Sequence, residues 1–265
     1  MLTTVKSNEK VVPGFFEMEI EAKGLAKHAG PGQFFMLKVA FGTDPLLRRP
    51  LSIHRITSPD SLRFLYRESG RGTSILSKLV PGDQLDALGP LGNGFKVGKT
   101  VKHALIVGGG IGVAPLLCLT DHIAKERPDI TPVVFIGGRD KDSVMCLDQF
   151  KELGIETHIR TEDGSIHKKG LITHSLEEYI DKYKKDGTGG WAIFSCGPTP
   201  MLRSVAAIAN MNDIKCFTSL EAHMACGIGA CLGCVIPLLD REHETQVYRK
   251  VCEDGPVFDS EEVLW

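Results

Sequence analysis

The cysteines near the end of the chain constrain this protein more than any other feature of its sequence. Cys226, Cys231 and Cys234 are spaced C-x4-C-x2-C, and Cys252 follows after 17 intervening residues. Three thiolates on one short loop and a fourth from elsewhere are the ligands of plant-type [2Fe–2S] clusters. We therefore predict that these four cysteines ligate a [2Fe–2S] cluster.

Glycines stand between these cysteines, at Gly227, Gly229 and Gly233. Because glycine has no Cβ, the backbone can wrap closely around an inorganic core and point N–H groups at its sulfur atoms. Two alternatives stay open. A structural zinc site usually has two short C-x2-C pairs, of which only one is present here, and the cysteines could also be unliganded.

Composition excludes several other classes of protein. A formal net charge of −2 in 265 residues lacks the basic excess of a nucleic-acid binder. No apolar run is long enough to span a bilayer, and Met1–Lys10 has no apolar signal core, so a cytoplasmic protein is expected. Disulfides are rare in that compartment. Three of the four scattered cysteines, Cys118, Cys146 and Cys216, are therefore expected to be buried small apolar residues. Cys196 is the exception, because it stands in a motif described below.

The pattern of hydrophobic residues divides the chain into three parts. Alternation over 14–22 and 61–68, with frequent turn signals, predicts a six-stranded antiparallel β-barrel over 1–100, including a short helix at 73–79. Strands alternating with helices predict a parallel α/β domain over 101–218. A small cysteine module follows over 219–265. The strands expected in the α/β domain are 103–107, 132–136, 155–160, 191–195 and 214–218, and the helices are 113–126, 142–153, 175–185 and 200–210.

A glycine loop joins the first α/β strand to the following helix, in the sequence Gly108-Gly-Gly110-Ile-Gly112-Val-Ala-Pro115. Backbone N–H groups at a helix N-terminus favour phosphate, so Gly110, Gly112 and Pro115 are candidates for nucleotide binding. A tight turn without a ligand would use the same glycines.

A second segment is predicted to face the same crevice. Cys196, Gly197 and Pro198 end a later strand of the sheet, and ligands bind at the carboxyl ends of such strands. Taken alone, Cys196 would be interpreted as a buried core thiol.

These motifs resemble the ferredoxin–NADP reductase superfamily. Residues 110–115 and 196–198 are similar to its nicotinamide half, 49–52 to its flavin motif, and 70–74 to its flavin-phosphate loop. With the cysteine tail, the resemblance narrows to the electron-transfer subunits of heterodimeric, NAD-dependent dihydroorotate dehydrogenases.

The resemblance implies an FAD at the end of the barrel. Arg49 is expected to neutralise its pyrophosphate and Ser52 to lie near flavin N5; the alternative for Arg48 and Arg49 is a solvated basic pair. The residues expected around FAD are Arg49, Pro50, Leu51, Ser52, Gly70, Gly72, Thr73 and Ser74.

One departure from the superfamily concerns the face of the flavin. Many reductases have Tyr where Leu51 stands, and end in an aromatic residue over the flavin, whereas this chain continues into the cysteine loop. The cluster module is therefore expected to pack near the flavin. His54 and His223 stand beside these motifs and are the two histidines most worth testing.

The same resemblance implies a function in pyrimidine biosynthesis. FAD can exchange hydride with NAD and single electrons with a cluster, so electrons are expected to pass from an FMN-containing catalytic subunit through the cluster and FAD to NAD+. Because that partner's barrel needs about 250 residues of its own, a complex is expected, as a heterotetramer of two plus two. Val263-Leu264-Trp265 and apolar residues near the cysteine loop are candidates for its interface. The chain alone should show only NAD(P)H diaphorase activity.

The choice of nicotinamide cofactor depends on residues after the second α/β strand. Arg139 and Lys141 could bind the 2′-phosphate of NADP, but Asp140 would oppose it and could bind a ribose hydroxyl. The resemblance favours NAD, with NADP possible. Residues 161–165 are predicted to form a turn near this crevice. Their composition is explained about equally well by the needs of a turn and by contact with the cofactor.

Two other functions remain open. Small FAD/[2Fe–2S] subunits of sulfide dehydrogenases or NADH-dependent ferredoxin:NADP oxidoreductases look similar, but typically have Asp where Cys226 stands. A redox sensor without turnover would show no diaphorase activity.

Overall fold

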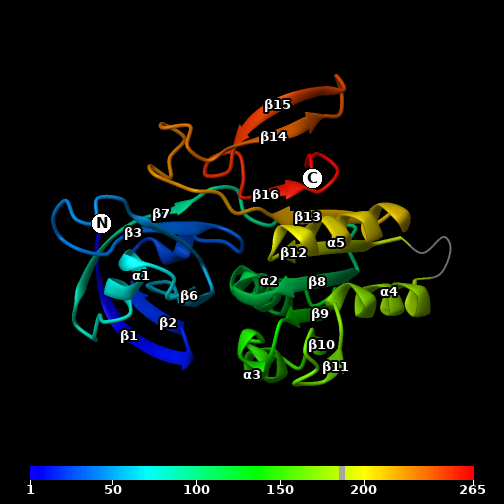
Figure 1. The fold of residues 1–265 in the computed structure, drawn as a ribbon, viewed down its shortest axis with the longest axis horizontal. Coiled ribbons are helices and arrows are strands. Elements are labelled where there is room, and N and C mark those ends of the chain that lie inside the picture. The colour runs from blue at the N-terminus through cyan, green and yellow to red at the C-terminus, as the bar shows by residue number, and fades with distance from the viewer. Residues whose placement is uncertain (185–188) are drawn as a thin grey trace.

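A computed structural model of the chain describes residues 1–184 and 189–265, and this part contains two seven-stranded sheets and a two-stranded sheet. Figure 1 shows the N-terminal antiparallel sheet beside the α/β domain, with the C-terminal tail lying along both. None of the described helices is both long and apolar enough to cross a membrane.

The N-terminal sheet closes into the predicted barrel. Its order is β4-β3-β7-β1-β2-β6-β5, so the two edge strands, β4 and β5, are neighbours in the chain, separated only by Ile53 and His54. The Ile53 N–H donates to Gln33 O (3.0 Å) and the His54 N–H to Arg63 O (2.8 Å). The sheet has seven strands rather than six because this kink divides one bent strand, 49–58, into two. The elements are β1 Leu2–Val12, β2 Phe15–Glu21, η1 Ala26–His28, β3 Phe34–Lys38, β4 Arg49–Ser52, β5 Arg55–Ser58, β6 Ser61–Arg67, α1 Arg71–Leu76 and β7 Gln84–Leu91.

Alternation along the strands fills the barrel interior. Met18 and Ile20 of β2 and Leu62, Phe64 and Tyr66 of β6 are spaced two apart, and all are fully or almost fully buried. Burying one such side chain contributes roughly 1.5–3 kcal/mol. The short helix predicted over 73–79 is present as α1, which begins and ends earlier.

The α/β domain has the predicted parallel sheet, in the order β11-β10-β9-β8-β12-β13, to which strand β16 of the tail (Val257–Asp259) adds an antiparallel edge. Helix 113–126 matches its prediction, whereas 142–153 forms only a 3-10 turn and the short α3. The helix predicted over 175–185 begins earlier, and Lys185 lies outside the described residues. The elements are β8 His103–Gly109, η2 Gly110–Gly112, α2 Val113–Glu126, β9 Thr131–Gly138, η3 Lys141–Ser143, α3 Leu147–Glu152, β10 Glu156–Thr161, β11 Lys168–Lys169, α4 Ile172–Tyr183, β12 Trp191–Cys196, α5 Thr199–Met211 and β13 Lys215–Ser219.

Both faces of this sheet are covered, as a parallel sheet requires. Along β8, Ala104 and Ile106 pack with residues of α2 and α3, whereas Leu105 and Val107 pack with residues of α4 and α5. The continuous apolar run in the sequence therefore reflects burial of both faces of the strand.

The tail is attached to both other units. It contains β14 Val235–Asp240, β15 Thr245–Lys250 and β16 Val257–Asp259, and β16 pairs antiparallel with β13. The Asn93 amide, after β7, donates to the carbonyls of Glu253 (2.9 Å) and Asp254 (3.1 Å). The cysteine loop is thereby held against the edge of the barrel.

Candidate functional site

The four clustered cysteines come together in space. The Gly229 N–H donates to Cys252 Sγ (3.1 Å), which brings the loop onto the fourth cysteine across 23 residues of sequence. The Cys252 N–H donates to Cys234 Sγ, the Cys231 N–H to Cys226 Sγ, and the Gly233 N–H to Cys231 Sγ, each at 3.4 Å. Every sulfur of the set thus accepts a backbone N–H, which is the environment predicted for cluster thiolates.

The glycines of the loop have separate roles. Gly227 and Gly229 adopt left-handed φ angles of 74° and 77°. A Cβ on Gly227 would lie 2.5 Å from Met36 Cγ in the barrel, and one on Gly229 would collide with the Glu253 carboxylate. Gly233, the third glycine of the loop, is not left-handed; the residue before it, Leu232, has a left-handed φ of 58° instead.

The thiols differ in how readily they lose a proton. N–H groups of Ile228 and Cys231 lower the pKa of the Cys226 thiol to about 6, which favours the thiolate that binds metal. Burial raises the pKa of the Cys252 thiol to about 11. No group of three or more His, Cys, Asp or Glu side chains in the described residues is arranged to hold a single metal ion. A two-iron cluster is ligated at two separate irons, so it needs a different arrangement. The four convergent thiols fit such a cluster.

The two arginines of the predicted flavin motif differ in role. Arg48 donates to the backbone oxygen of Asp86 (2.7 Å) and to its carboxylate (2.5 Å), and this bond holds the pKa of Asp86 below its usual value. Arg48 therefore fastens β4 to β7. Arg49 bonds the Leu47 carbonyl, and its guanidinium lies where a Cβ of Gly72 would be. The pair is thus not merely a solvated basic patch.

The loop before α1 is shaped by its own hydrogen bonds. The Thr73 hydroxyl oxygen accepts from the N–H groups of Ser69 (2.9 Å) and Gly70 (3.1 Å) and donates to Gly70 O (3.0 Å). Because this hydroxyl is engaged within the loop, Thr73 holds the shape of the loop.

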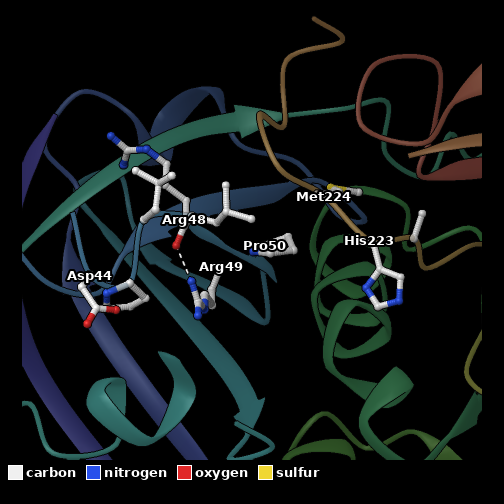
Figure 2. Close-up of a pocket in the computed structure, with 10 residues that line it drawn as sticks. Asp44, Arg48, Arg49, Pro50, His223 and Met224 are labelled. Carbon is white, nitrogen blue, oxygen red and sulfur yellow. Dashed lines mark hydrogen bonds between the residues drawn. The ribbon is translucent and has the colours of Figure 1, made fainter. Parts of the chain in front are cut away.

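A cavity of about 470 Å³ joins the flavin motif to the tail. Figure 2 shows Arg49 and Pro50 of β4 on one side and His223 and Met224 on the other. The tail segment before Cys226 therefore forms one wall of this pocket, as expected from its sequence, whereas Leu51 and Ser52 lie outside the lining. The lining residues are Asp44, Pro45, Leu46, Leu47, Arg48, Arg49, Pro50, Ala222, His223 and Met224.

The glycine loop and the segment after β12 meet as predicted. Cys196 is paired in register with Gly108, and a Cβ on Gly112 would collide with the backbone of Cys196 and lie 2.6 Å from Gly197 Cα. Pro115 is buried in the first turn of α2. Burial raises the pKa of the Cys196 thiol to about 12, so this side chain is a neutral core thiol.

Comparison with known proteins decides the family. The model of the iron–sulfur cluster binding domain of dihydroorotate dehydrogenase B matches residues 221–264, and that of the oxidoreductase NAD-binding domain matches 106–207. The dihydroorotate dehydrogenase B (NAD(+)) electron transfer subunit of Desulforamulus reducens is 38% identical over 257 residues, covering 96% of this chain and 94% of that protein. The chain belongs to this family.

Other members of the electron transfer subunit family match equally completely. The subunit of Caldanaerobacter subterraneus subsp. tengcongensis is 38% identical, covering 100% of this chain and 98% of its own. Among solved structures, an NADH-dependent reduced ferredoxin–NADP oxidoreductase studied for electron bifurcation has a TM-score of 0.85 and 26% identity, covering 100% of this chain and 90% of its own. An Amycolatopsis cytochrome P450 reductase shares the fold, with a TM-score of 0.66, 22% identity and coverage of 79% and 65%.

One of the alternative functions was that of a small subunit of the NADH-dependent ferredoxin–NADP oxidoreductase type. The solved structure of that type matches this chain over its whole length, as expected, but its sequence identity of 26% is lower than the 38% of the dihydroorotate dehydrogenase B subunit. In this chain the Cys226 sulfur accepts a hydrogen bond from the Cys231 N–H within the loop.

Residues 139–141, which were predicted to influence the choice between NAD and NADP, lie beside the turn over 161–165. The Glu162 N–H donates to Gly138 O (3.0 Å) and the Asp163 N–H to Arg139 O (3.1 Å), so the turn over 161–165 lies against the end of β9. The Asp140 carboxylate accepts from the Ser143 N–H (3.0 Å) and caps η3. The capping role of this carboxylate was not predicted from the sequence.

Six residues that line the pocket were also not predicted. They are Asp44, Pro45, Leu46 and Leu47 before the flavin motif, and Ala222 and Met224, whose place directly before Cys226 was a signal for this. Asp86, which anchors Arg48 but does not line the pocket, was not predicted either. Asp86 lies 38 residues from its partner, and no local pattern indicates this pairing.

Proposed function

We propose that this chain is the electron-transfer subunit of a dihydroorotate dehydrogenase B, passing electrons from a catalytic partner through a [2Fe–2S] cluster and FAD to NAD+. The observation that carries the proposal is the shared pocket, with the flavin motif on one side and the segment leading into the cysteine loop on the other. Because residues 222–224 line this pocket just before Cys226, a cluster held by the cysteine loop would lie close to the FAD.

Each unit of the chain then has one task. We assign FAD to the barrel over 1–100, NAD to the α/β domain over 101–218 and the cluster to residues 219–265. When bound, FAD exchanges hydride with NAD and single electrons with the cluster. The chain's own residues bind and orient these groups: Arg49 with Gly70, Gly72 and Ser74 for FAD, the loop over 110–115 with 196–198 for NAD, and Cys226, Cys231, Cys234 and Cys252 for iron.

Arg49 is expected to hold the FAD pyrophosphate. Losing a hydrogen bond to a charged group costs roughly 1.5–3 kcal/mol, so Arg49→Ala should weaken FAD binding by about ten- to a hundredfold. Flavin fluorescence during titration of the apoprotein measures this. Arg67→Ala is the control, because Arg67 is an exposed arginine of the same barrel that lies over the Phe15 ring. Equal FAD affinity of Arg49→Ala and the unaltered protein would contradict the assignment.

The partner is expected to dock on apolar residues around the cysteines. Ile228 and Leu232 of the loop are 55% and 64% exposed. Of the predicted tail residues, only Leu264 is largely exposed, because Val263 pairs with Leu238 and the Trp265 ring donates to Ser260 O (3.3 Å). The interface is therefore centred on the cysteine loop, which places the cluster near the FMN of the partner.

A charge in this surface should separate the subunits. In Ile228→Glu and Leu232→Glu, an unpaired carboxylate would be buried on assembly, which is unfavourable. We expect loss of the heterotetramer on size exclusion with light scattering, while diaphorase activity is kept. Met211→Glu is the matched control, because Met211 is 73% exposed at the end of α5, away from the loop. A normal complex from both loop variants would exclude this surface.

The whole proposal is tested by reconstitution. The anaerobically purified chain should contain flavin and a rhombic one-electron cluster signal in EPR, and should oxidise NADH with an artificial acceptor. Adding the FMN-containing catalytic subunit should give dihydroorotate-dependent formation of NADH. A chain replete in both cofactors that forms no NADH with that partner would overturn the proposal. We further infer that the protein works in the cytoplasm, since none of the eight cysteines forms a disulfide.

A further inference from the structure

His54 lies at the point where the barrel closes, two residues after Ser52 at the end of β4. Its side chain is fully buried. Its backbone N–H donates to Arg63 O (2.8 Å), which joins the kink between β4 and β5 to β6. The ring is therefore held in a fixed place relative to the strand that carries the flavin motif.

The imidazole also contacts the nucleotide domain. Nδ1 lies 3.0 Å from the carbonyl oxygen of Ala114, in the first turn of α2 directly after the glycine loop. Nε2 lies 3.3 Å from Glu17 Oε2 on β2, within ion-pair distance but without hydrogen-bond alignment. The Ala114 oxygen can only accept, so Nδ1 carries a proton, and the charge of the nearby Glu17 carboxylate favours a second proton on Nε2. Burial opposes the charge, but the Cys146 sulfur and the two oxygens outweigh it and raise the pKa of His54.

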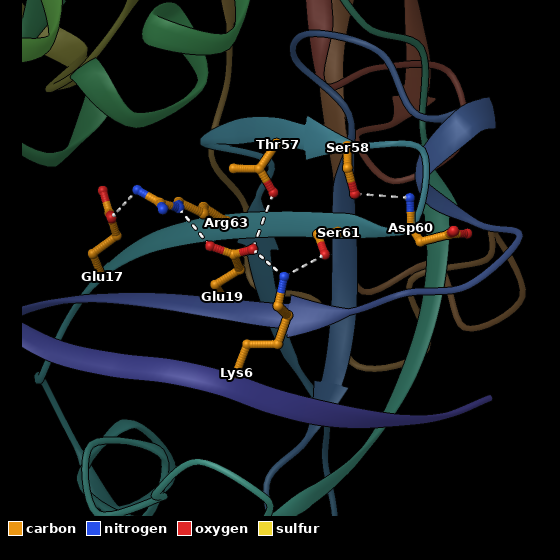
Figure 3. Close-up of polar contacts among 8 residues, drawn as sticks. All are labelled: Lys6, Glu17, Glu19, Thr57, Ser58, Asp60, Ser61 and Arg63. Carbon is orange, nitrogen blue, oxygen red and sulfur yellow. Dashed lines mark hydrogen bonds and ion pairs between the residues drawn. The ribbon is translucent and has the colours of Figure 1, made fainter.

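Glu17 is itself held in place by a row of charged side chains on the barrel, which Figure 3 shows. Arg63 donates from Nη1 to Glu17 (3.0 Å) and from Nε to Glu19 (2.8 Å), and Lys6 donates to Glu19 (2.9 Å). The interaction with His54, against the effect of burial, lowers the pKa of Glu17. A fixed carboxylate therefore holds the far side of the imidazole.

The two units do not depend on His54 to stay together. Leu65 of β6 and Phe95 pack in one buried cluster with residues of α2. Arg55, the next residue in the chain, forms a second polar link, with Nη2 3.4 Å from Asp121 Oδ1. Removing the imidazole would thus change the distance between the barrel and the α/β domain only near Ala114, and the rest of the contact between these two units would stay in place.

We propose that His54 is a positioning residue for hydride exchange, whose ring sets the spacing between the flavin-motif strand β4 and the start of α2 after the nucleotide loop. The inference rests on the proposed function and deepens it. NADH gives up a hydride to become NAD+, and the flavin receives that hydride. The rate depends steeply on the separation of the two reacting atoms, and a displacement of about 1 Å can cost roughly a hundredfold.

Rapid mixing of NADH with the FAD- and cluster-loaded chain tests this. In His54→Leu, which lacks both donors, flavin reduction should be slower by about ten- to a hundredfold. The primary isotope effect with NADH deuterated at the transferred position should rise, because hydride transfer becomes fully rate-limiting. FAD and iron content should stay at the level of the unaltered protein. His54→Gln, which keeps one donor for Ala114 O, should be intermediate.

Arg55→Met is the matched control, since it removes the neighbouring polar link between the same two units. It should keep both the rate and the isotope effect. A reduction rate and isotope effect in His54→Leu equal to those of the unaltered protein would overturn the inference. If the leucine variant does not fold, equal values in His54→Gln would overturn it instead. Failure of the unaltered protein to be reduced by NADH would instead refute the proposed function.

Discussion

Cys231→Ala is expected to abolish dihydroorotate-dependent reduction of NAD+ in the reconstituted complex. Removing one thiolate leaves one of the two irons with a single protein ligand. The remaining sulfurs cannot replace the lost one, because each is directed by its own backbone N–H. Anaerobic EPR and iron analysis should show the loss of the cluster signal. Oxidation of NADH with an artificial acceptor should continue, because FAD and the nucleotide loop lie in other parts of the chain.

The control for the cluster prediction is Cys118→Ala. Cys118 is buried on α2, where it packs with the barrel core, so its loss should cost some stability and leave the cluster intact. Retention of a normal cluster signal in Cys231→Ala would remove this cysteine from the ligand set. Loss of the signal in both variants would show that the cluster responds to stability alone.

Gly112→Ala should remove most of the activity with NADH. The φ of Gly112 is −61°, which alanine adopts readily. The added Cβ would however collide with the backbone of Cys196, and a backbone neighbour cannot rotate away. The loop must therefore shift, and with it the N–H groups expected to bind the pyrophosphate. We expect a displacement of about 1 Å and roughly a hundredfold lower kcat/KM for NADH, with FAD content unchanged.

Steady-state kinetics of the artificial-acceptor reaction measures this second effect. Gly98→Ala is the matched control, because the nearest atom to its Cβ would be Val101 Cγ2 at an ordinary 3.6 Å. An unchanged kcat/KM in Gly112→Ala would show that the close approach of the two segments has no part in nucleotide binding.

Patterns that repeat along a strand or helix were sufficient to predict much of the fold. Helix α2 was predicted at its observed bounds, Val113–Glu126, because glycines precede it and a long helix-like run follows them. The buried strands β8, β9 and β12 were predicted from continuous apolar runs. β1 was not predicted, because its sequence, LTTVKSNEKVV, is polar at most positions and few of its residues are buried. It is a strand because β2 and β7 pair with it.

In the candidate site, too, local features were predicted from the sequence and contacts between distant residues were not. The cysteine spacing, the glycine loop and the flavin motif are local, so their chemistry could be predicted residue by residue. The pairing of Arg48 with Asp86 joins residues 38 apart, and that of His54 with Ala114 joins residues 60 apart. Neither pair leaves a periodic signal in the sequence, so the separate role of Arg48 became visible only in three dimensions.

The sequence alone thus determined which groups the chain can bind, because ligand spacing and glycine placement are properties of short segments. Only the tertiary structure decided how those segments face one another: the kink at residues 53 and 54 closes the barrel, Asn93 holds the tail across 160 residues of sequence, and residues 222–224 complete the pocket. The physical reason is that such contacts depend on the packing of whole units, whose geometry no single stretch of sequence encodes.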